Sequence, residues 1–266
     1  MSFFEHLDEL RHRLKVVAVF VIGFFLFFLV FSVMPVSVGS PTIPVPVPAF
    51  LYDDDPIANK FFRALQDYYT GGQNVTFFPS QLWDGVIVQF KVAFFLSVIA
   101  ASPVIAYEFA KFIGPALKAS EKRLIVRIAL PVFGLFAFGV AVAHLIILPF
   151  TFRFLLGILD RLNVARILFI DEFVTFVTVF LVAFGMAFEL PVVMYSLSAV
   201  GIVKADFWRR YWRIVVIGIF LFAAFLTPDA SGITMILVAI PMVCLYGVGY
   251  LAIRRREKRL SRAKSS

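Results

Sequence analysis

The residue in this sequence with the clearest chemical meaning is Glu189, which lies inside a long apolar stretch. Residues 173–200 form a 28-residue run in which the only other ionisable side chain is Tyr195. A charged side chain near the centre of a bilayer costs roughly 3 kcal/mol on insertion scales, against about −0.5 kcal/mol for each Leu, Ile, Phe or Val, so the run can carry one acid. Glu189 is then either a protonated carboxyl bonded to a neighbouring helix, for instance to a free carbonyl near Pro191, or a functional group facing protein or water. We favour the functional interpretation, because acids inside membrane spans mark functional sites more often than not.

Lys91 and His144 are the other strongly polar ionisable side chains that fall within apolar stretches. Lys91 can extend its aliphatic stem so that the ammonium group reaches the membrane surface, or it can pair with a carboxylate. His144 can bond to the backbone of a neighbouring helix or relay protons. If Glu189, Lys91 and His144 converge at the midplane, the chain would be a proton-coupled secondary transporter. We keep this function as the alternative to the one that the motifs described below imply.

Motifs of catalysis and metal binding are absent from the sequence. It contains no H-E-x-x-H, no G-x-S-x-G and no cluster of Cys and His at metal-ligand spacing. We therefore expect no catalytic activity, no metal site and no cofactor.

The composition is that of a polytopic membrane protein. Apolar residues make up 61% of the chain, 34 residues are Phe, and the mean hydropathy is +0.94. A helix needs about 20 apolar residues to cross a hydrocarbon slab about 30 Å thick. An all-α fold with six transmembrane helices is predicted, at residues 14–34, 86–107, 128–149, 173–200, 214–227 and 233–253. The fifth stretch has only 14 residues, so the fifth and sixth spans are expected to be short and to form a tight hairpin around Pro228 and Asp229.

The placement of Lys and Arg predicts the orientation in the membrane. Of 25 such residues, 19 fall in the N-terminal segment, the loops after spans two and four, and the C-terminal tail, whereas five fall in the opposite loops and Lys91 in a span. The positive-inside rule then places both termini in the cytoplasm. Residues 1–266 are expected to form one integral membrane domain, with a cytoplasmic amphipathic segment at 1–13 and a basic cytoplasmic tail at 254–266. The net charge of +8 implies no nucleic-acid partner, because anionic lipid headgroups attract basic residues beside membrane ends.

Residues 35–83 form the one long loop, which this orientation places on the outer side. Four prolines predict an extended spacer at its start: Pro41, Pro44, Pro46 and Pro48. A short amphipathic helix is expected next, with Asp55 as N-cap, Pro56 at the first helical position and an end at Gly71. Its apolar residues recur at helical spacing: Ile57, Phe61, Leu65 and Tyr68.

Several short motifs follow one another in order along nearly the whole chain. H-L-D-E-L-R-H-R-L at residues 6–14 stands directly before the first span, and its leucines at 7, 10 and 14 make it amphipathic. The first cytoplasmic loop contains A-S-P-V-I at 101–105, F-I-G-P-A-L at 112–117 and E-K-R at 121–123. A-F-G-M-A-F-E-L-P follows at 183–191, and L-T-P-D at 226–229 and A-I-P at 239–241 surround the last hairpin. This ordered series resembles the TatC family, the six-span receptor subunits of twin-arginine protein translocases.

The resemblance implies a cytoplasmic docking site for signal peptides that carry paired arginines. The residues that match the family's docking segments are Glu9, Arg11, Arg13, Phe112, Glu121, Lys122 and Arg123. Glu9 and Glu121 offer carboxylates that a guanidinium can engage with two hydrogen bonds, which an ammonium group cannot reproduce. The plain alternative is that both acids form local ion pairs that contribute little.

The resemblance also implies a second, intramembrane site for single-span partner subunits of the TatA/TatB type. Glu189 and Pro191 would line it, with Asp229 and Thr234 near its outer end, while Pro131, Pro149, Pro191 and Pro241 would bend the helices around it. Such a receptor works in the cell membrane of a prokaryote as part of a larger, homo-oligomeric complex, uses the proton-motive force and catalyses no reaction. The chain departs from the family at Gly114 and Gly247, where other members carry glutamate.

Overall fold

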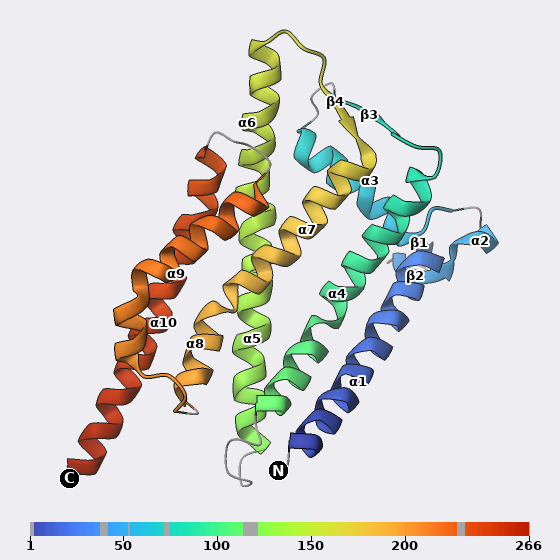
Figure 1. The fold of residues 1–266 in the computed structure, drawn as a ribbon. Coiled ribbons are helices and arrows are strands. Elements are labelled where there is room, and N and C mark those ends of the chain that lie inside the picture. Colours follow the sequence, from blue (N-terminus) through green and yellow to red (C-terminus); the bar gives the residue numbers. More distant parts are fainter. Residues whose placement is uncertain are drawn as a thin grey trace. The chain divides into compact units, whose positions relative to one another are not determined.

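Helices account for most of the computed structural model of this chain, which describes residues 3–37, 42–52, 54–71, 75–113, 122–199, 201–227 and 232–265 (Figure 1). The chain divides into two compact units, each built from two segments that are distant in sequence. Unit 1 comprises Met1–Glu108 and Leu148–Val179, and unit 2 comprises Phe109–Ile147 and Phe180–Ser266.

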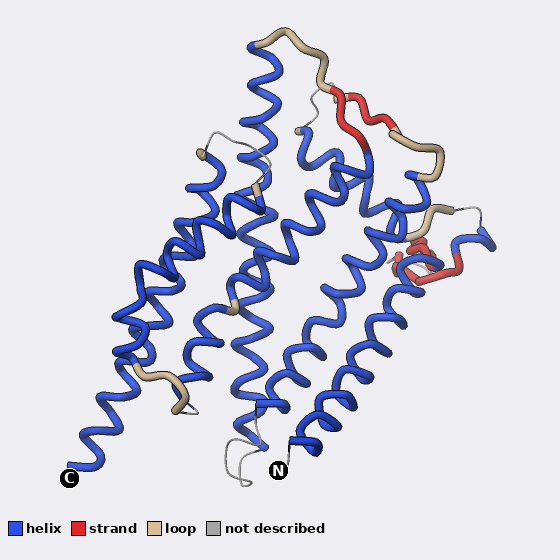
Figure 2. The backbone as a smooth tube through the Cα atoms, in the orientation of Figure 1, coloured by secondary structure: helices blue, strands red, loops and turns tan. Residues whose placement is uncertain are grey.

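The helices of unit 1 are α1 (Phe3–Val30), α2 (Ala49–Tyr52), α3 (Ile57–Thr70), most of α4 (Asp84–Ile113), α6 (Leu148–Arg161) and the first half of α7 (Ile170–Phe188). Unit 2 contains α5 (Lys122–Val142), the π-helical turn η2 (Ala143–Ile147), the rest of α7, α8 (Leu190–Ala199), α9 (Ala205–Leu226) and α10 (Ile233–Ser265). The strands of the described residues are short and form two two-stranded sheets, both in unit 1 (red in Figure 2). The predicted helical fold class is confirmed.

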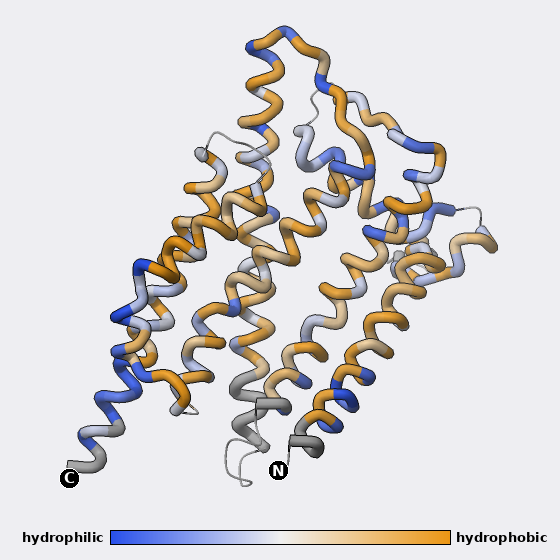
Figure 3. Tube along the Cα trace, viewed as in Figure 1, coloured by the Kyte–Doolittle hydropathy of each residue, from blue (hydrophilic) through white to orange (hydrophobic). Residues whose placement is uncertain are grey.

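Five helical stretches of the described residues are long and apolar enough to cross a membrane: Leu7–Val30, Asp84–Lys111, Ala129–Arg161, Ile170–Ala199 and Ile233–Arg259. Hydrophobic residues cover most of their length in Figure 3. They correspond to five of the six predicted spans, and α9 lies where the remaining one, residues 214–227, was expected. α9 has 22 residues, because Arg209, Arg210 and Arg213, which the hydropathy pattern assigns to a loop, continue the helix. That α9 crosses the membrane and that both termini are cytoplasmic stay predictions.

The first predicted span is wrong at its outer end. Residues 31–34 belong to strand β1 (Phe31–Ser37), which pairs with β2 (Thr42–Pro48) in an antiparallel hairpin from Phe31↔Pro48 to Ser37↔Thr42. The predicted extended spacer is therefore a paired strand instead. Successive residues of a strand turn their N–H groups to opposite edges of the strand. The prolines at every second position of β2 therefore all fall on one edge, and the residues between them keep the N–H groups that can donate to β1.

α3 confirms the helix predicted in the long loop but not all of its details. Gly71 ends it in the left-handed conformation, with φ 58°. Asp55 is not the N-cap, because Pro56 occupies that position and has no side-chain cap; the Asp55 carboxylate instead pairs with Arg63 at 2.7 Å. Leu65 is buried as expected, whereas Tyr68 is exposed and its neighbour Tyr69 packs into unit 1. Burial raises the pKa of the Tyr69 hydroxyl well above its usual value.

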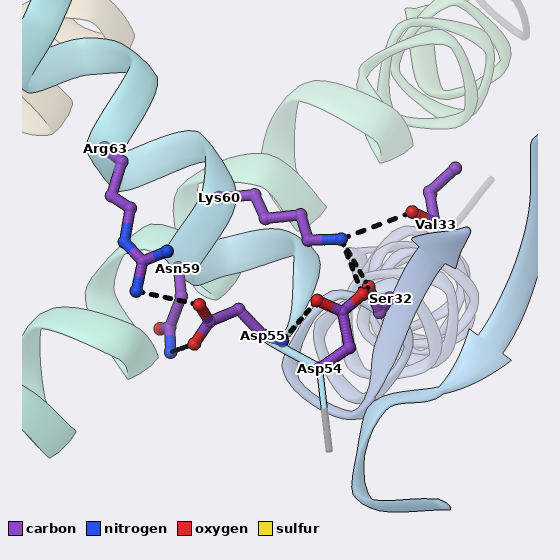
Figure 4. A network of polar contacts seen from close by, with 7 residues as sticks. All are labelled: Ser32, Val33, Asp54, Asp55, Asn59, Lys60 and Arg63. Atoms are coloured by element: carbon purple, nitrogen blue, oxygen red, sulfur yellow. Dashed lines mark hydrogen bonds and ion pairs between the residues drawn. The ribbon is translucent and has the colours of Figure 1, made fainter. Parts of the chain in front are cut away.

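A polar network ties the start of β1 to α3 (Figure 4). The Lys60 ammonium donates to Asp54 Oδ2 at 2.6 Å, to Ser32 Oγ at 2.8 Å and to the Val33 carbonyl at 3.3 Å, and Ser32 Oγ donates to the same Asp54 oxygen at 2.5 Å. Ser32 is fully buried. One lysine on α3 therefore orients the strand that follows the first span.

Acidification is expected to loosen this network between about pH 4 and pH 2. Hydrogen bonds from Lys60 and then Ser32 lower the pKa of Asp54 from 3.8 to about 2. A carboxyl whose pKa is lowered by folding contributes stability that is fully present above its unfolded-state pKa and is lost as the pH falls through its folded-state pKa. Thermal unfolding of the wild type and of Asp54→Asn should therefore differ in Tm above about pH 4 and converge towards pH 2. A difference that stays constant over this range would contradict the assignment.

The helix that carries Glu189 is broken at that residue. α7 ends at Phe188, Glu189 forms a turn, and α8 begins at Leu190. The Glu189 N–H bonds to the Met186 carbonyl, three residues back, at 3.0 Å, and Pro191 has no N–H with which to continue the helical ladder. Residues 173–200 were predicted as one span, and a bend at Pro191 was expected from its proline. The π-helical turn η2 directly precedes Leu148 and Pro149, whereas Pro131 and Pro241 lie inside continuous helices.

The predicted basic tail continues α10 as a helix, and its side chains form hydrogen bonds with the end of α8 and the start of α9. Arg256 donates to the last carbonyls of α8, Ser198 at 3.1 Å and Ala199 at 3.3 Å. The Glu257 carboxylate accepts from the Ala205 N–H at the start of α9, at 2.9 Å. Cations at helix C-termini and anions at N-termini stabilise the helix ends. Consecutive residues of the tail therefore cap two helices.

Candidate functional site

A guanidinium lies between two carboxylates at the N-terminal end of unit 1. Arg13 pairs through one nitrogen with Glu9, one turn earlier on α1, and through Nη1 with Glu108 Oε2 of α4 at 3.1 Å. The three side chains are largely buried, with 17%, 18% and 11% of their surfaces exposed. Glu9 Oε2 and Arg13 Nε are buried and have no hydrogen-bond partner among the described residues.

This ion-pair cluster contains Glu9 and Arg13, two of the predicted docking residues, and Glu108, which was not predicted. The local ion pair of Glu9, which was the plain alternative to docking, is present, since Arg13 stands four residues away on the same helix. Glu108 follows directly after the predicted end of the second span at residue 107. A carboxylate at a span end, in the loop that carries the family motifs, was the available signal for it. Guanidinium groups suit such a site because their planar fork of donors can serve two carboxylates at once.

The structure places the remaining predicted docking residues only in part. Arg11 is exposed on α1. Phe112 lies in the last turn of α4, and Lys122 and Arg123 lie in the first turn of α5. Glu121 lies outside the described residues.

The intramembrane acid Glu189 sits at the break between α7 and α8. Both of its carboxylate oxygens are buried, and neither has a hydrogen-bond partner of normal geometry among the described residues. The backbone of Phe136 in α5 interacts with the carboxylate. The bond that the alternative interpretation requires, from the Glu189 carboxyl to a free carbonyl near Pro191, is therefore not formed among these residues. An acceptor group buried without a partner is costly, so a group of this kind is suited to receive a donor from another molecule.

Two glycines bring α5 and α7 into close contact next to Glu189. A Cβ added at Gly139 would lie 2.8 Å from Cβ and Cγ of Phe188 and 3.0 Å from the Gly185 Cα. A Cβ added at Gly185 would lie 2.8 Å from the side chains of Phe136 and Val140. The position of Phe188, and hence of the adjacent Glu189, depends on the absence of side chains at these two positions.

The other predicted intramembrane residues are buried or undescribed. Pro191 is buried, and its Cα lies 3.1 Å from where a Cβ on Gly249 of α10 would be. Thr234 is fully buried in α10, and its hydroxyl has no partner among the described residues. Asp229 lies outside them.

Lys91 has a carboxylate partner of its own in unit 1. Its ammonium group donates to Asp171 Oδ1 of α7 at 2.5 Å and to Thr175 Oγ1 at 2.7 Å. Of the two expectations for Lys91, pairing is confirmed. The alternative function, a proton-coupled transporter, requires the Lys91 ammonium group to act together with Glu189. The charge of Lys91 is instead balanced by Asp171. Among the described residues, no group of three or more His, Cys, Asp or Glu side chains could hold a metal ion.

Comparisons with known proteins point to a single family. A family model described as "Sec-independent protein translocase protein (TatC)" matches residues 5–241. A protein of the same description from Cenarchaeum symbiosum is 36% identical over 262 residues, covering 97% of this chain and 97% of that protein. Its counterpart from Aquifex aeolicus is 31% identical over 267 residues, covering 97% and 98%. A solved structure described as "Crystal Structure of Twin Arginine Translocase Receptor- TatC in DDM" is similar with a TM-score of 0.74 and 28% identity, over 93% of this chain and 99% of that chain.

Proposed function

Because this chain belongs to the TatC family of protein translocase subunits, we propose that its cytoplasmic end binds export signals that carry paired arginines. The chain is a multi-pass subunit of the twin-arginine translocase in the cell membrane and is not an enzyme. In this proposal it holds the signal peptide of a folded precursor while partner subunits form the passage and the proton-motive force drives transport.

One observation carries the docking proposal: the site already binds a guanidinium. Glu9 and Glu108 hold Arg13 from two different helices, so the carboxylates have the spacing and burial that an arginine side chain requires. Burial strengthens each charge-assisted hydrogen bond, because the local dielectric constant is lower than that of water. Arg11, Phe112, Glu121, Lys122 and Arg123 would complete the site around the second arginine and the flanking residues of the signal.

The intramembrane acid supports a second contact, with single-span subunits of the TatA/TatB type. Glu189 offers two buried acceptor oxygens and Thr234 a buried hydroxyl, all without partners among the described residues. A polar side chain on the membrane helix of a partner would satisfy such acceptors, and hydrogen bonds of this kind associate helices within lipid. Pro191 and Asp229 would shape the same contact, and copies of the chain would assemble with these partners in a larger complex.

Peptide binding to the purified, detergent-solubilised chain tests the docking proposal. An Arg-Arg signal peptide is expected to bind at least about tenfold more tightly than its Lys-Lys variant, because the ammonium group lacks the planar fork. Glu9→Gln and Glu121→Gln should each weaken binding of the Arg-Arg peptide. Asp8→Asn is the matched control, since Asp8 is an exposed acid beside Glu9 on the same helix. Equal binding of both peptides to all forms would overturn the proposal.

A further inference from the structure

We propose that Arg13 is an internal occupant of the docking site, which a signal-peptide arginine displaces from Glu9 while Glu108 retains it. This inference rests on the docking function proposed above and adds Glu108 to the residues that govern it. Arg13 would then act as a competitor that raises the threshold for binding, so that only a guanidinium of equal strength replaces it.

The first step of the argument is that Arg13 has two anchors on different helices. Its pair with Glu9 lies within α1, whereas its pair with Glu108 joins residues 95 positions apart, from α1 to α4. A guanidinium held by two separate carboxylates can leave one and remain bound to the other. Arg13 can therefore give up Glu9 without becoming an unpaired buried charge, which would be strongly unfavourable.

The second step is that the resting arrangement is incomplete. Glu9 uses one oxygen for Arg13, and its Oε2 is buried without a partner among the described residues, as is Arg13 Nε. A buried acceptor without a donor is unfavourable relative to the same acceptor when hydrogen-bonded. A second guanidinium that reaches Glu9 can donate to both carboxylate oxygens, and Arg13 can then turn its full fork towards Glu108.

The third step concerns selectivity for arginine over lysine. A signal side chain must replace a guanidinium that already forms charge-assisted hydrogen bonds with Glu9. An arginine exchanges one such interaction for an equivalent one, whereas a lysine replaces a planar fork by a point charge. Selectivity for arginine therefore arises in two ways. Glu9 attracts the guanidinium, and competition from Arg13 disfavours a lysine. An empty pair of acids would bind both side chains more tightly and distinguish them less well.

Binding of the Arg-Arg and Lys-Lys peptides to the purified chain tests this exchange. Arg13→Gln should bind the Arg-Arg peptide about tenfold more tightly and the Lys-Lys peptide by a larger factor, so that discrimination shrinks. Glu108→Gln should weaken binding of the Arg-Arg peptide about tenfold. Glu9 is then the one carboxylate left to pair with Arg13, so Arg13 cannot leave Glu9 without becoming an unpaired charge. In the double variant Arg13→Gln with Glu108→Gln, affinity should return towards that of Arg13→Gln, a non-additivity expected of coupled groups. Lys15→Gln, an equal loss of charge at an exposed position of α1, should change little.

The outcomes separate this inference from the docking function on which it rests. If Glu9→Gln binds both peptides like the wild type, the docking proposal fails. If Glu9→Gln loses binding but Arg13→Gln also binds more weakly than the wild type, docking stands and the exchange is overturned. The same holds if the double variant is as weak as Glu108→Gln. Thermal unfolding verifies that each variant is folded, and Arg13→Lys, which keeps the charge without the fork, should also tighten binding if Arg13→Gln does not fold.

Discussion

Gly139→Ala is expected to destabilise the protein and to reduce export of a twin-arginine reporter, although it adds a single methyl group. The new Cβ would lie 2.8 Å from Cβ of Phe188 and 3.0 Å from the Gly185 Cα. These atoms belong to the backbone or are fixed directly to it, so they cannot rotate away as the end of a long side chain can. Overpacking of this kind costs about 1–3 kcal/mol. The helices would have to separate at the point where Phe188 positions Glu189.

Gly134→Ala is the matched control for this prediction. Gly134 lies on the same helix, α5, and a Cβ there would meet no atom within 4 Å. Alanine in a helix interior is favoured over glycine by about 0.5–1 kcal/mol, so this variant should be unchanged or slightly more stable. The measurements are Tm in detergent and export in cells that lack their own copy of the gene. Equal behaviour of the two variants would show that α5 and α7 do not approach as closely as described.

Glu189→Leu is expected to make the protein more stable and less active at the same time. Both carboxylate oxygens are buried without a partner among the described residues. Removing such a group recovers a desolvation penalty of about 1–3 kcal/mol, which corresponds to an increase in Tm of a few degrees for a chain of this size. Export should fall at least about tenfold, because the proposed acceptor for the partner subunit is lost.

The control for the Glu189 variant is Glu172→Leu, which removes an exposed acid from the first turn of the same helix. It should leave both Tm and export nearly unchanged. A Glu189→Leu variant that unfolds more easily than the wild type would show that the carboxyl has a structural hydrogen bond. Unimpaired export would show that Glu189 does not contact a partner that transport requires.

Hydropathy located the membrane helices of this chain but not their ends. Residues 31–34 are as apolar as the preceding helix, yet they form a strand because β2 supplies hydrogen-bond partners from Phe31 to Ser37. A short apolar run satisfies either structure, and the pattern within it does not reveal which partner is available. For α9 the hydropathy pattern instead placed the start of the helix too late, at residue 214 rather than at Ala205. The charged residues before residue 214 remain helical because their side chains can reach water.

The candidate sites show the same division between local and distant information. The sequence alone pointed to Glu9, Arg13 and Glu189, because a contiguous family motif and an isolated acid in an apolar run are local features. It did not reveal that Arg13 also binds Glu108, or that Lys91 is paired with Asp171, which is 80 positions away. Pairing across helices depends on the rotation and axial offset of each helix, and hydropathy constrains neither.

The sequence by itself determined that this protein is a helical membrane protein of the TatC family and which of its acids lie in apolar or basic surroundings. Composition decides the solvent a chain needs, and short motifs are contiguous, so both are readable without a fold. Only the tertiary structure decided that Glu9 and Glu108 together hold the Arg13 guanidinium, that the Glu189 carboxylate lacks a partner among the described residues, and that Gly139 and Gly185 set its position. Those facts depend on side-chain packing between helices, where a single methyl group changes the outcome.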